Sequence, residues 1–393
     1  MYQGRKIAGL IALILIFIFT GASAQKPRAR ELGVPFSGTP GRLNAITDVA
    51  GVLVGHVTLV SGEGKLVVGK GPVRTGITAI FPRGRQYNPI FAGWATLNGN
   101  GEMTGTTWLK ESGFLEGPIL LTNTHSVGVA RDALIEWEFR HHYFDPLPED
   151  PGLFWSLPVV AETYDGDLND INGFHVKKED VFRALELADT GKVAEGNVGG
   201  GTGMVCHEFK GGIGTSSRKV LIDQVEYTIG VLVQANYGVR STLTISGVPV
   251  GREITDMMPV LNPIRDSEDR GSIIAVVATD APLLPGQLER IARRVTVGIS
   301  RVGGYGGNSS GDLFIAFSTA NEGAAKRTGI QNIRMLSNDR LSPLFEATAQ
   351  ATEEAIVNAL FAAETMTGKN GTKVYCLPVD RVIALLKGYN RIR

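Results

Sequence analysis

A glycine and a serine at positions 271 and 272 open a short apolar run, Ser-Ile-Ile-Ala-Val-Val-Ala-Thr, which ends at residue 279. A serine at the head of a β-branched run lies where a strand begins, and a glycine before it has access to backbone angles that are closed to other residues. Cleavage of the Gly271–Ser272 bond would give Ser272 a free α-amine, whose ordinary pKa is about 7.7 to 8.0. That amine could act as the general base for its own hydroxyl. The same dipeptide is also typical of a plain turn before a buried strand.

The positions of the histidines restrict the alternatives. All six lie before Ser272, the last of them at His207, whereas a serine hydrolase of the α/β-hydrolase type needs its histidine after the nucleophile. Residues 307–311 match Gly-x-Ser-x-Gly with Ser309 at the centre, but they cannot form a triad in that order. A nucleophile in the last third of the chain therefore takes its base from an upstream histidine, as Ser309 with His207 would, or from its own amine.

Longer motifs surround these positions, and together they carry a resemblance. They are GNVGGGTGM at 196–204, CHEFKGGIGTSSR at 206–218, VQANYG at 233–238, GSIIAVVATDAP at 271–282 and GNSSGD at 307–312. With shorter segments at 98–105, 122–129 and 161–166, they resemble the DmpA family of L-aminopeptidase/D-esterases, which also contains the β-peptidyl aminopeptidases. The resemblance extends from about residue 30 to the end of the chain, and several long motifs in the right order are more specific than one glycine cluster.

The resemblance implies a self-processing hydrolase. Ser272 would attack the carbonyl of Gly271, form an ester and be released by water, which leaves a long chain, 25–271, and a short chain, 272–393. The same serine would then form an acyl-enzyme with small peptides, amino-acid amides or esters and release their N-terminal residue without a metal or a cofactor. Two alternatives stay open: an uncut serine hydrolase that uses Ser309, and an exported relative that has lost catalysis and binds amines or peptides.

The resemblance also assigns the other site residues. Asn236 matches an oxyanion-hole amide, Tyr164 matches a tyrosine beside the nucleophile, and Glu162 matches an acid that receives the free amino group of the substrate. Ser310 and Asp312 are two residues apart, which places them on one side of an extended segment, and the family has a serine and an acid there, near the amine of the nucleophile. The β-peptidyl members carry glutamate where this chain has Asp312, so the acceptance of β-linked residues stays open.

The start of the chain and its charge indicate where the protein acts. Basic residues at 5 and 6, an apolar stretch over 7–19 and Ala-Ser-Ala at 22–24 form the layout of a secretory signal, 1–24, so we expect a periplasmic or secreted enzyme. A retained N-terminal anchor is the alternative. Lys plus Arg and Asp plus Glu number 39 each, and this neutral balance disfavours nucleic acid or stable membrane association after signal removal. The resemblance adds a homo-oligomer, a tetramer of processed protomers.

Weaker motifs are set aside. The glycine clusters lack the Lys-Ser or Lys-Thr of a nucleotide loop, and the calcium-like segment that begins at Asp165 has Asp170 where the loop needs glycine. An oxidising compartment permits a disulfide between Cys206 and Cys376, but their spacing does not demand one, and we expect two buried thiols.

Hydrophobic patterns predict one layered α+β domain over residues 25–393, without a linker. Strands are expected near 52–60, 76–81, 118–122, 157–162, 219–235, 272–279 and 313–318, and helices near 127–140, 178–189, 284–302, 342–366 and 378–387. The resemblance implies a four-layer αββα sandwich, similar to that of the N-terminal-nucleophile hydrolases but differently connected.

Overall fold

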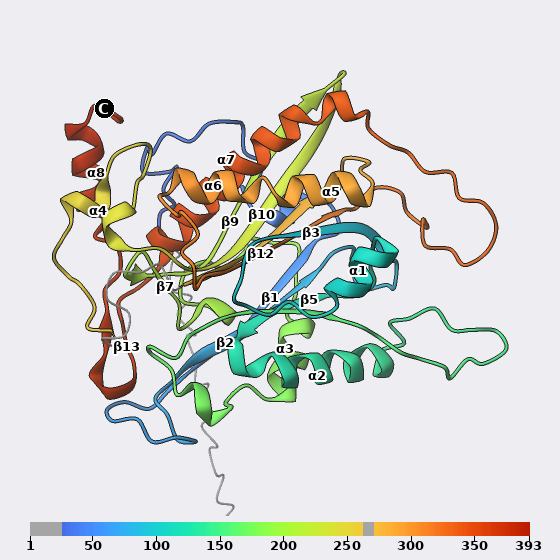
Figure 1. The fold of residues 1–393 in the computed structure, drawn as a ribbon, viewed down its shortest axis with the longest axis horizontal. Coiled ribbons are helices and arrows are strands. Elements are labelled where there is room, and N and C mark those ends of the chain that lie inside the picture. Colours follow the sequence, from blue (N-terminus) through green and yellow to red (C-terminus); the bar gives the residue numbers. More distant parts are fainter. Residues whose placement is uncertain (1–25, 262–270) are drawn as a thin grey trace, which may run out of the picture.

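Two β-sheets stacked face to face form the centre of the molecule (Figure 1). The computed structural model describes residues 26–261 and 271–393, and the expected signal segment, 1–24, lies outside these described residues. The first sheet has four strands in the order β1-β2-β5-β6, of which β5 and β6 run parallel and the other neighbours antiparallel. Its strands are β1 (Leu53–Ser61), β2 (Val73–Phe81), β5 (Ile119–Asn123) and β6 (Val159–Thr163).

The second sheet has six strands in the order β4-β3-β12-β11-β10-β9. Strands β11 and β12 are parallel, and the other neighbouring pairs are antiparallel. All eight positions of β11 are buried, as expected of a continuous β-branched run in the middle of a sheet. The strands are β3 (Ile90–Gly99), β4 (Phe114–Leu115), β9 (Gly212–Ile222), β10 (Val225–Asn236), β11 (Ser272–Thr279) and β12 (Gly311–Ser318).

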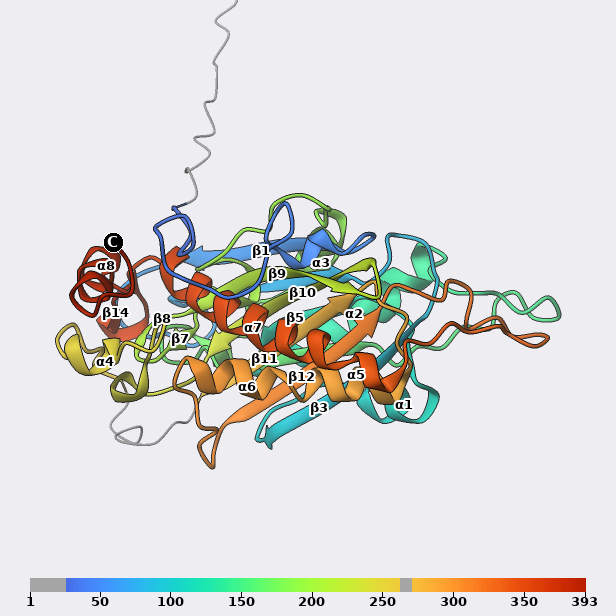
Figure 2. The same ribbon diagram turned by 90° about the horizontal axis from the view of Figure 1, so that it is seen from above.

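Helices cover the outer face of each sheet. Helices α2 (Val127–Arg140) and α3 (Lys178–Glu186) pack on the first sheet, while α5 (Pro285–Ala292), α6 (Val295–Arg301) and α7 (Ser342–Ala362) pack on the second. Figure 2 shows α7 lying over β9 and β10. The remaining elements are α1 (Thr106–Ser112), α4 (Val250–Glu253), α8 (Val379–Gly388) and two short hairpins, β7 (Val205–Cys206) with β8 (Phe209–Lys210), and β13 (Met366–Thr367) with β14 (Lys373–Val374).

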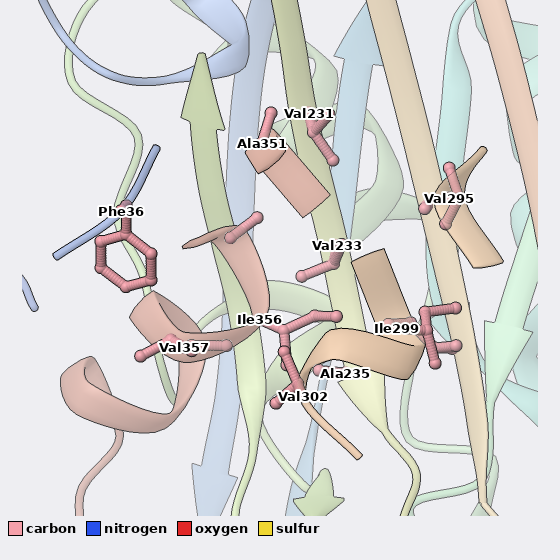
Figure 3. Close-up of a cluster of buried hydrophobic side chains, with 14 of the residues drawn as sticks. Phe36, Val231, Val233, Ala235, Val295, Ile299, Val302, Ala351, Ile356 and Val357 are labelled. Atoms are coloured by element: carbon pink, nitrogen blue, oxygen red, sulfur yellow. The ribbon is translucent and has the colours of Figure 1, made fainter. Parts of the chain in front are cut away.

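Alternation along the strands divides the hydrophobic core into layers. Ile274 and Val276 of β11 face the first sheet, whereas Ile273 and Ala275 face the helices. Figure 3 shows the helix side, where Val231, Val233 and Ala235 of β10 lie near side chains of α6 and α7 such as Ile299 and Ile356. Burying each such Val or Ile stabilises the fold by about 1.5–3 kcal/mol. The result is the αββα sandwich that the resemblance predicted.

Two predicted elements need correction. The single strand expected at 219–235 is wrong, because β9 and β10 form a hairpin whose turn residues, Asp223 and Gln224, have φ of 48° and 68°. Two consecutive positive φ angles are typical of a type I′ turn, but the pair lacks the glycine that marks such turns in a sequence. The helix expected at 284–302 is divided into α5 and α6, and Arg293 and Arg294 between them keep right-handed helical angles.

Some expectations on burial are also corrected. Both cysteines are free thiols, and Cys206 is buried as expected, but Cys376 is only half-buried.

Strand β3 and helix α1 were not predicted at all. Within residues 26–261 and 271–393, none of the helices combines the length and the apolar character needed to span a bilayer.

Candidate active site

Ser272 is the first residue of β11, in the interior of the six-stranded sheet. It pairs with Asn236, the last residue of β10, and with Gly311, the first residue of β12. Only 7% of Ser272 is exposed. Because Ile274 and Val276 face the first sheet, alternation points the Ser272 side chain to that side as well, together with the directly opposite Asn236. The predicted nucleophile therefore lies at the end of an interior strand, on the face that is turned to the other sheet.

Gly271 is required by close packing. A Cβ at this position would lie 2.1 Å from the main-chain oxygen of Asn236 and 2.3 Å from Cα of Tyr237. The glycine is therefore needed because a side chain has no space here. The Gly271 carbonyl accepts a hydrogen bond of 3.2 Å from the N–H of Gly311. This donor could stabilise negative charge that develops on the carbonyl oxygen.

Asn236 is held by hydrogen bonds at both ends of its amide. Oδ1 accepts from the main-chain N–H of Val205 at 2.8 Å, and Nδ2 donates to the main-chain carbonyl of Tyr164 at 3.0 Å. The side chain is buried, with the residue 3% exposed. The two bonds fix which end of the amide is the donor, and Nδ2 carries two hydrogens, of which Tyr164 takes one. The arrangement suits an amide that donates to an oxyanion.

Tyr164 directly follows β6, and its ring packs against Gly166. A Cβ at Gly166 would lie 2.3 Å from Oη of Tyr164 and 2.4 Å from its Cζ, so the tyrosine ring occupies the space that a side chain would fill. Its main-chain carbonyl is the acceptor for Asn236, which ties the end of β6 in the first sheet to the end of β10 in the second. The structure thus brings Tyr164 and Asn236 together.

Glu162 is a buried carboxylate near the end of β6. The residue is 3% exposed, and its Oε1 accepts from the main-chain N–H of Glu102 at 3.0 Å, while Oε2 accepts from the hydroxyl of Thr124. Burial raises the pKa of Glu162, and these hydrogen bonds oppose the rise. Glu162 Oε1 and Cα of Gly311 both lie 3.3 Å from the point where a Cβ of Gly101 would be. The carboxylate is therefore close to the strand that pairs with Ser272.

Ser310 and Asp312 flank Gly311 and are both buried. The Ser310 hydroxyl donates to Oδ1 of Asp312 at 2.6 Å. This hydrogen bond shows that the two side chains lie on the same side of the chain at the start of β12. A position beside the main chain of Ser272 fits a role near its amine better than a direct contact with its hydroxyl.

The structure does not favour the alternative nucleophile. The buried hydroxyl of Ser309 makes no hydrogen bond to any of the described residues. His207 instead places its Nδ1 3.0 Å from the carbonyl of Val239 and packs edge-on against Tyr237, with ring centroids 5.0 Å apart. A Ser309–His207 pair is therefore not formed.

Buried polar residues that sequence reasoning missed support the site. Gln234 of β10 donates from Nε2 to the carbonyl of Thr122 at 2.9 Å and to the hydroxyl of Thr163 at 2.8 Å, which links the two sheets. Burial raises the pKa of Asp165 to about 6, against hydrogen bonds from side chains that include Asn123. Gln234 lies in the 233–238 motif and Asp165 lies in the 161–166 motif, but nothing in these motifs shows what the two side chains contact. In the part of the chain that the structure describes, no cluster of three or more His, Cys, Asp or Glu could hold a metal.

Comparisons with known proteins show the family of this chain. Residues 44–374 match the sequence profile of peptidase family S58. The chain belongs to peptidase family S58. A beta-peptidyl aminopeptidase BapA of Sphingosinicella microcystinivorans is 53% identical to this S58 chain over 393 residues, which cover 97% of each protein.

Solved structures resemble the S58 chain over almost its full length. The L-aminopeptidase D-Ala-esterase/amidase from Ochrobactrum anthropi, described as a variant of the Ntn hydrolase fold, superposes with a TM-score of 0.86 and 46% identity, covering 94% of this chain and 100% of that one. A beta-aminopeptidase from Burkholderia sp. has a TM-score of 0.82 and 48% identity, covering 92% and 99%. The predicted DmpA family, the fold and the assignment as a hydrolase with aminopeptidase activity are confirmed.

Proposed function

We propose that this S58 aminopeptidase cuts its own chain between Gly271 and Ser272 and then works through an acyl-enzyme on Ser272. The observation that carries the proposal is the position of the Gly271–Ser272 bond, with its carbonyl on the N–H of Gly311 and with Asn236 opposite Ser272. In the cut, Oγ of Ser272 attacks the Gly271 carbonyl carbon, the peptide C–N bond breaks, and the proton of the hydroxyl passes to the departing nitrogen. Water then hydrolyses the ester and leaves a carboxylate on Gly271 and an amine on Ser272.

The new amine provides the base for substrate hydrolysis. It takes the proton of the Ser272 hydroxyl as Oγ attacks the substrate carbonyl, and it passes that proton to the leaving amine or alcohol. The second hydrogen of Asn236 Nδ2 and the hydroxyl of Tyr164 donate to the oxyanion, and one such donor is worth about 10²- to 10³-fold in rate. Ser310 and Asp312, joined at 2.6 Å, orient the amine. Water releases the acyl group.

Glu162 selects substrates that begin with a free amine. A buried carboxylate next to β12 can pair with the substrate ammonium in a site shielded from water, which limits cleavage to the first residue. The substrates are small peptides, amino-acid amides and esters, and the 53% identity to a beta-peptidyl aminopeptidase supports β-linked first residues among them. Although Asp312 is shorter than glutamate, it still reaches Ser310, so the exchange does not argue against β-linked substrates.

We also propose that residues 1–24 direct export to the periplasm or beyond, and that the processed protein forms a homo-oligomer. The three-part leader supports export, and the neutral charge balance supports a small-molecule substrate over nucleic acid or a membrane surface. Fractionation of expressing cells tests the location, because a cytoplasmic full-length product would contradict it.

Two serine variants test the mechanism against its alternative. Ser272→Ala should remain one chain and hydrolyse no amino-acid amide, whereas Ser309→Ala, the matched control, should be cut and active. Denaturing electrophoresis and release of p-nitroaniline from an amino-acid p-nitroanilide measure both properties. An active Ser272→Ala enzyme with an inactive Ser309→Ala enzyme would establish the uncut hydrolase instead.

A further inference from the structure

Lys210, in β8, is a fully buried lysine next to the site, and the proposed reaction steps do not use it. Its exposed fraction is 0%, and a buried ammonium is costly unless its hydrogens are all bonded. Its Nζ donates to three main-chain carbonyls: Met204 at 2.7 Å, Gly211 at 2.8 Å and Gly201 at 3.3 Å. Three donors thus meet three acceptors, and the charge is held in one place.

One of these acceptors belongs to the peptide that also holds Asn236. The carbonyl of the Met204–Val205 peptide accepts from Lys210, and the N–H of the same peptide donates to Oδ1 of Asn236 at 2.8 Å. Val205 and Lys210 are paired residues of the β7–β8 hairpin, so their relative position is fixed by the ladder. A continuous line of hydrogen bonds therefore leads from the ammonium through one peptide to the Asn236 amide and on to Tyr164.

Each bond in such a line strengthens the next. An ammonium at the carbonyl end of a peptide polarises it, which makes its N–H a better donor to Asn236 and makes Nδ2 of that amide a better donor in turn. The effect is large only where water is excluded, and both Lys210 and Asn236 are buried. Burial lowers the pKa of Lys210 to about 7, while the nearby Asp165 and Cys206 raise it, and the three carbonyl dipoles also favour the charged form.

We propose that Lys210 is a positioning residue for the aminopeptidase reaction, which acts through the Met204–Val205 peptide to orient the Asn236 amide and strengthen its Nδ2–H toward the oxyanion. The inference rests on the role proposed for Asn236. A purely structural Lys210, which only ties residues 201–211 together, would act independently of Asn236.

A double-mutant cycle separates the two roles. The enzymes are wild type, Lys210→Met, Asn236→Ala and the double variant, each assayed with an amino-acid p-nitroanilide and normalised to the fraction of cut protein found by intact mass. Lys210→Met should lower kcat roughly 10-fold with KM within about twofold, because the lost stabilisation belongs to the transition state. In the Asn236→Ala background, the same substitution should lower kcat no further.

Several results would contradict the proposed role of Lys210. Equal kcat losses from Lys210→Met in both backgrounds, or wild-type kcat in Lys210→Met, would overturn the role of Lys210 while leaving the proposed function intact. Wild-type kcat in Asn236→Ala would overturn the proposed oxyanion donor and the relay together. If Lys210→Met does not fold, Lys210→Arg keeps a cation and enters the same cycle. Its smaller loss should again vanish without Asn236, and a loss that persists there counts against the relay.

Discussion

Replacing Gly166 with alanine should displace the Tyr164 hydroxyl while leaving the core intact. The three atoms nearest to an added Cβ, the closest at 2.3 Å, all belong to the Tyr164 side chain, and no main-chain atom is among them. A methyl carbon rarely comes within about 3.0 Å of another heavy atom, so the hydroxyl has to move by roughly 1 Å. The ring can make this movement by small rotations of its own side chain.

A movement of this size is enough to remove the hydrogen bond that we propose from the Tyr164 hydroxyl to the oxyanion. Hydrogen bonds weaken steeply beyond their usual length, and a misplacement of about 1 Å in an active site costs about 10²-fold in rate. We therefore expect kcat of Gly166→Ala to fall about 10²-fold. The melting temperature and KM should change little, because the contact is with the end of one side chain.

Steady-state kinetics on fully cut protein, together with a thermal melt, measure both effects. Gly286→Ala in α5 is the matched control, because a Cβ there meets no heavy atom within 4 Å. Combining Gly166→Ala with Tyr164→Phe should give an enzyme no slower than Tyr164→Phe alone. Wild-type kcat in Gly166→Ala, or a loss that is undiminished in the Tyr164→Phe background, would refute the reasoning.

Three further variants test other parts of the site and fold. Glu162→Gln should raise KM for substrates with a free amine about 10- to 100-fold, because a charged hydrogen-bond partner is lost. Since burial raises the pKa of Glu162, wild-type KM should also rise as the pH falls through a range above that of an ordinary glutamate, and an unchanged acidic limb in Glu162→Gln would contradict this assignment. Asp312→Asn should reduce kcat roughly 10-fold, because the proposed amine of Ser272 loses its orientation. A fall in kcat that is accompanied by a lower melting temperature would point to a structural role instead. Glu354→Ala should lower the free energy of unfolding by about 3–5 kcal/mol in a denaturant titration, because it leaves the buried Arg218 without its carboxylate, and a change below 1 kcal/mol would be inconsistent with a buried ion pair.

The sequence alone predicts those elements whose structure is determined by a local pattern of residues. The run at 272–279 predicts β11 with its observed bounds, because continuous β-branched residues are typical of a strand buried on both faces. Strand β3 was missed because Gly93 weakens its strand pattern. The structure shows why a glycine is there: a Cβ would lie 2.3 Å from the main-chain nitrogen of Glu289 in α5. A requirement set by a helix far along the chain leaves no local signal.

The site, too, could be predicted only in part from the sequence. The proposed nucleophile and its neighbours could be named from motifs, and the structure brings them to the ends of adjacent strands and loops. Lys210 and Gln234 could not be assigned a role, because their partners are main-chain carbonyls and a hydroxyl that only the folded chain brings near. The reason for Gly271 was also inaccessible, since it depends on the backbone of Asn236 across the sheet.

Intact mass and N-terminal sequencing of the purified wild-type protein test the central claim most directly. The account predicts two polypeptides, of which one reads Ser-Ile-Ile-Ala from its first residue. A single uncut polypeptide that still hydrolyses amino-acid amides would contradict it, because Ser272 would then have no amine with which to activate its hydroxyl.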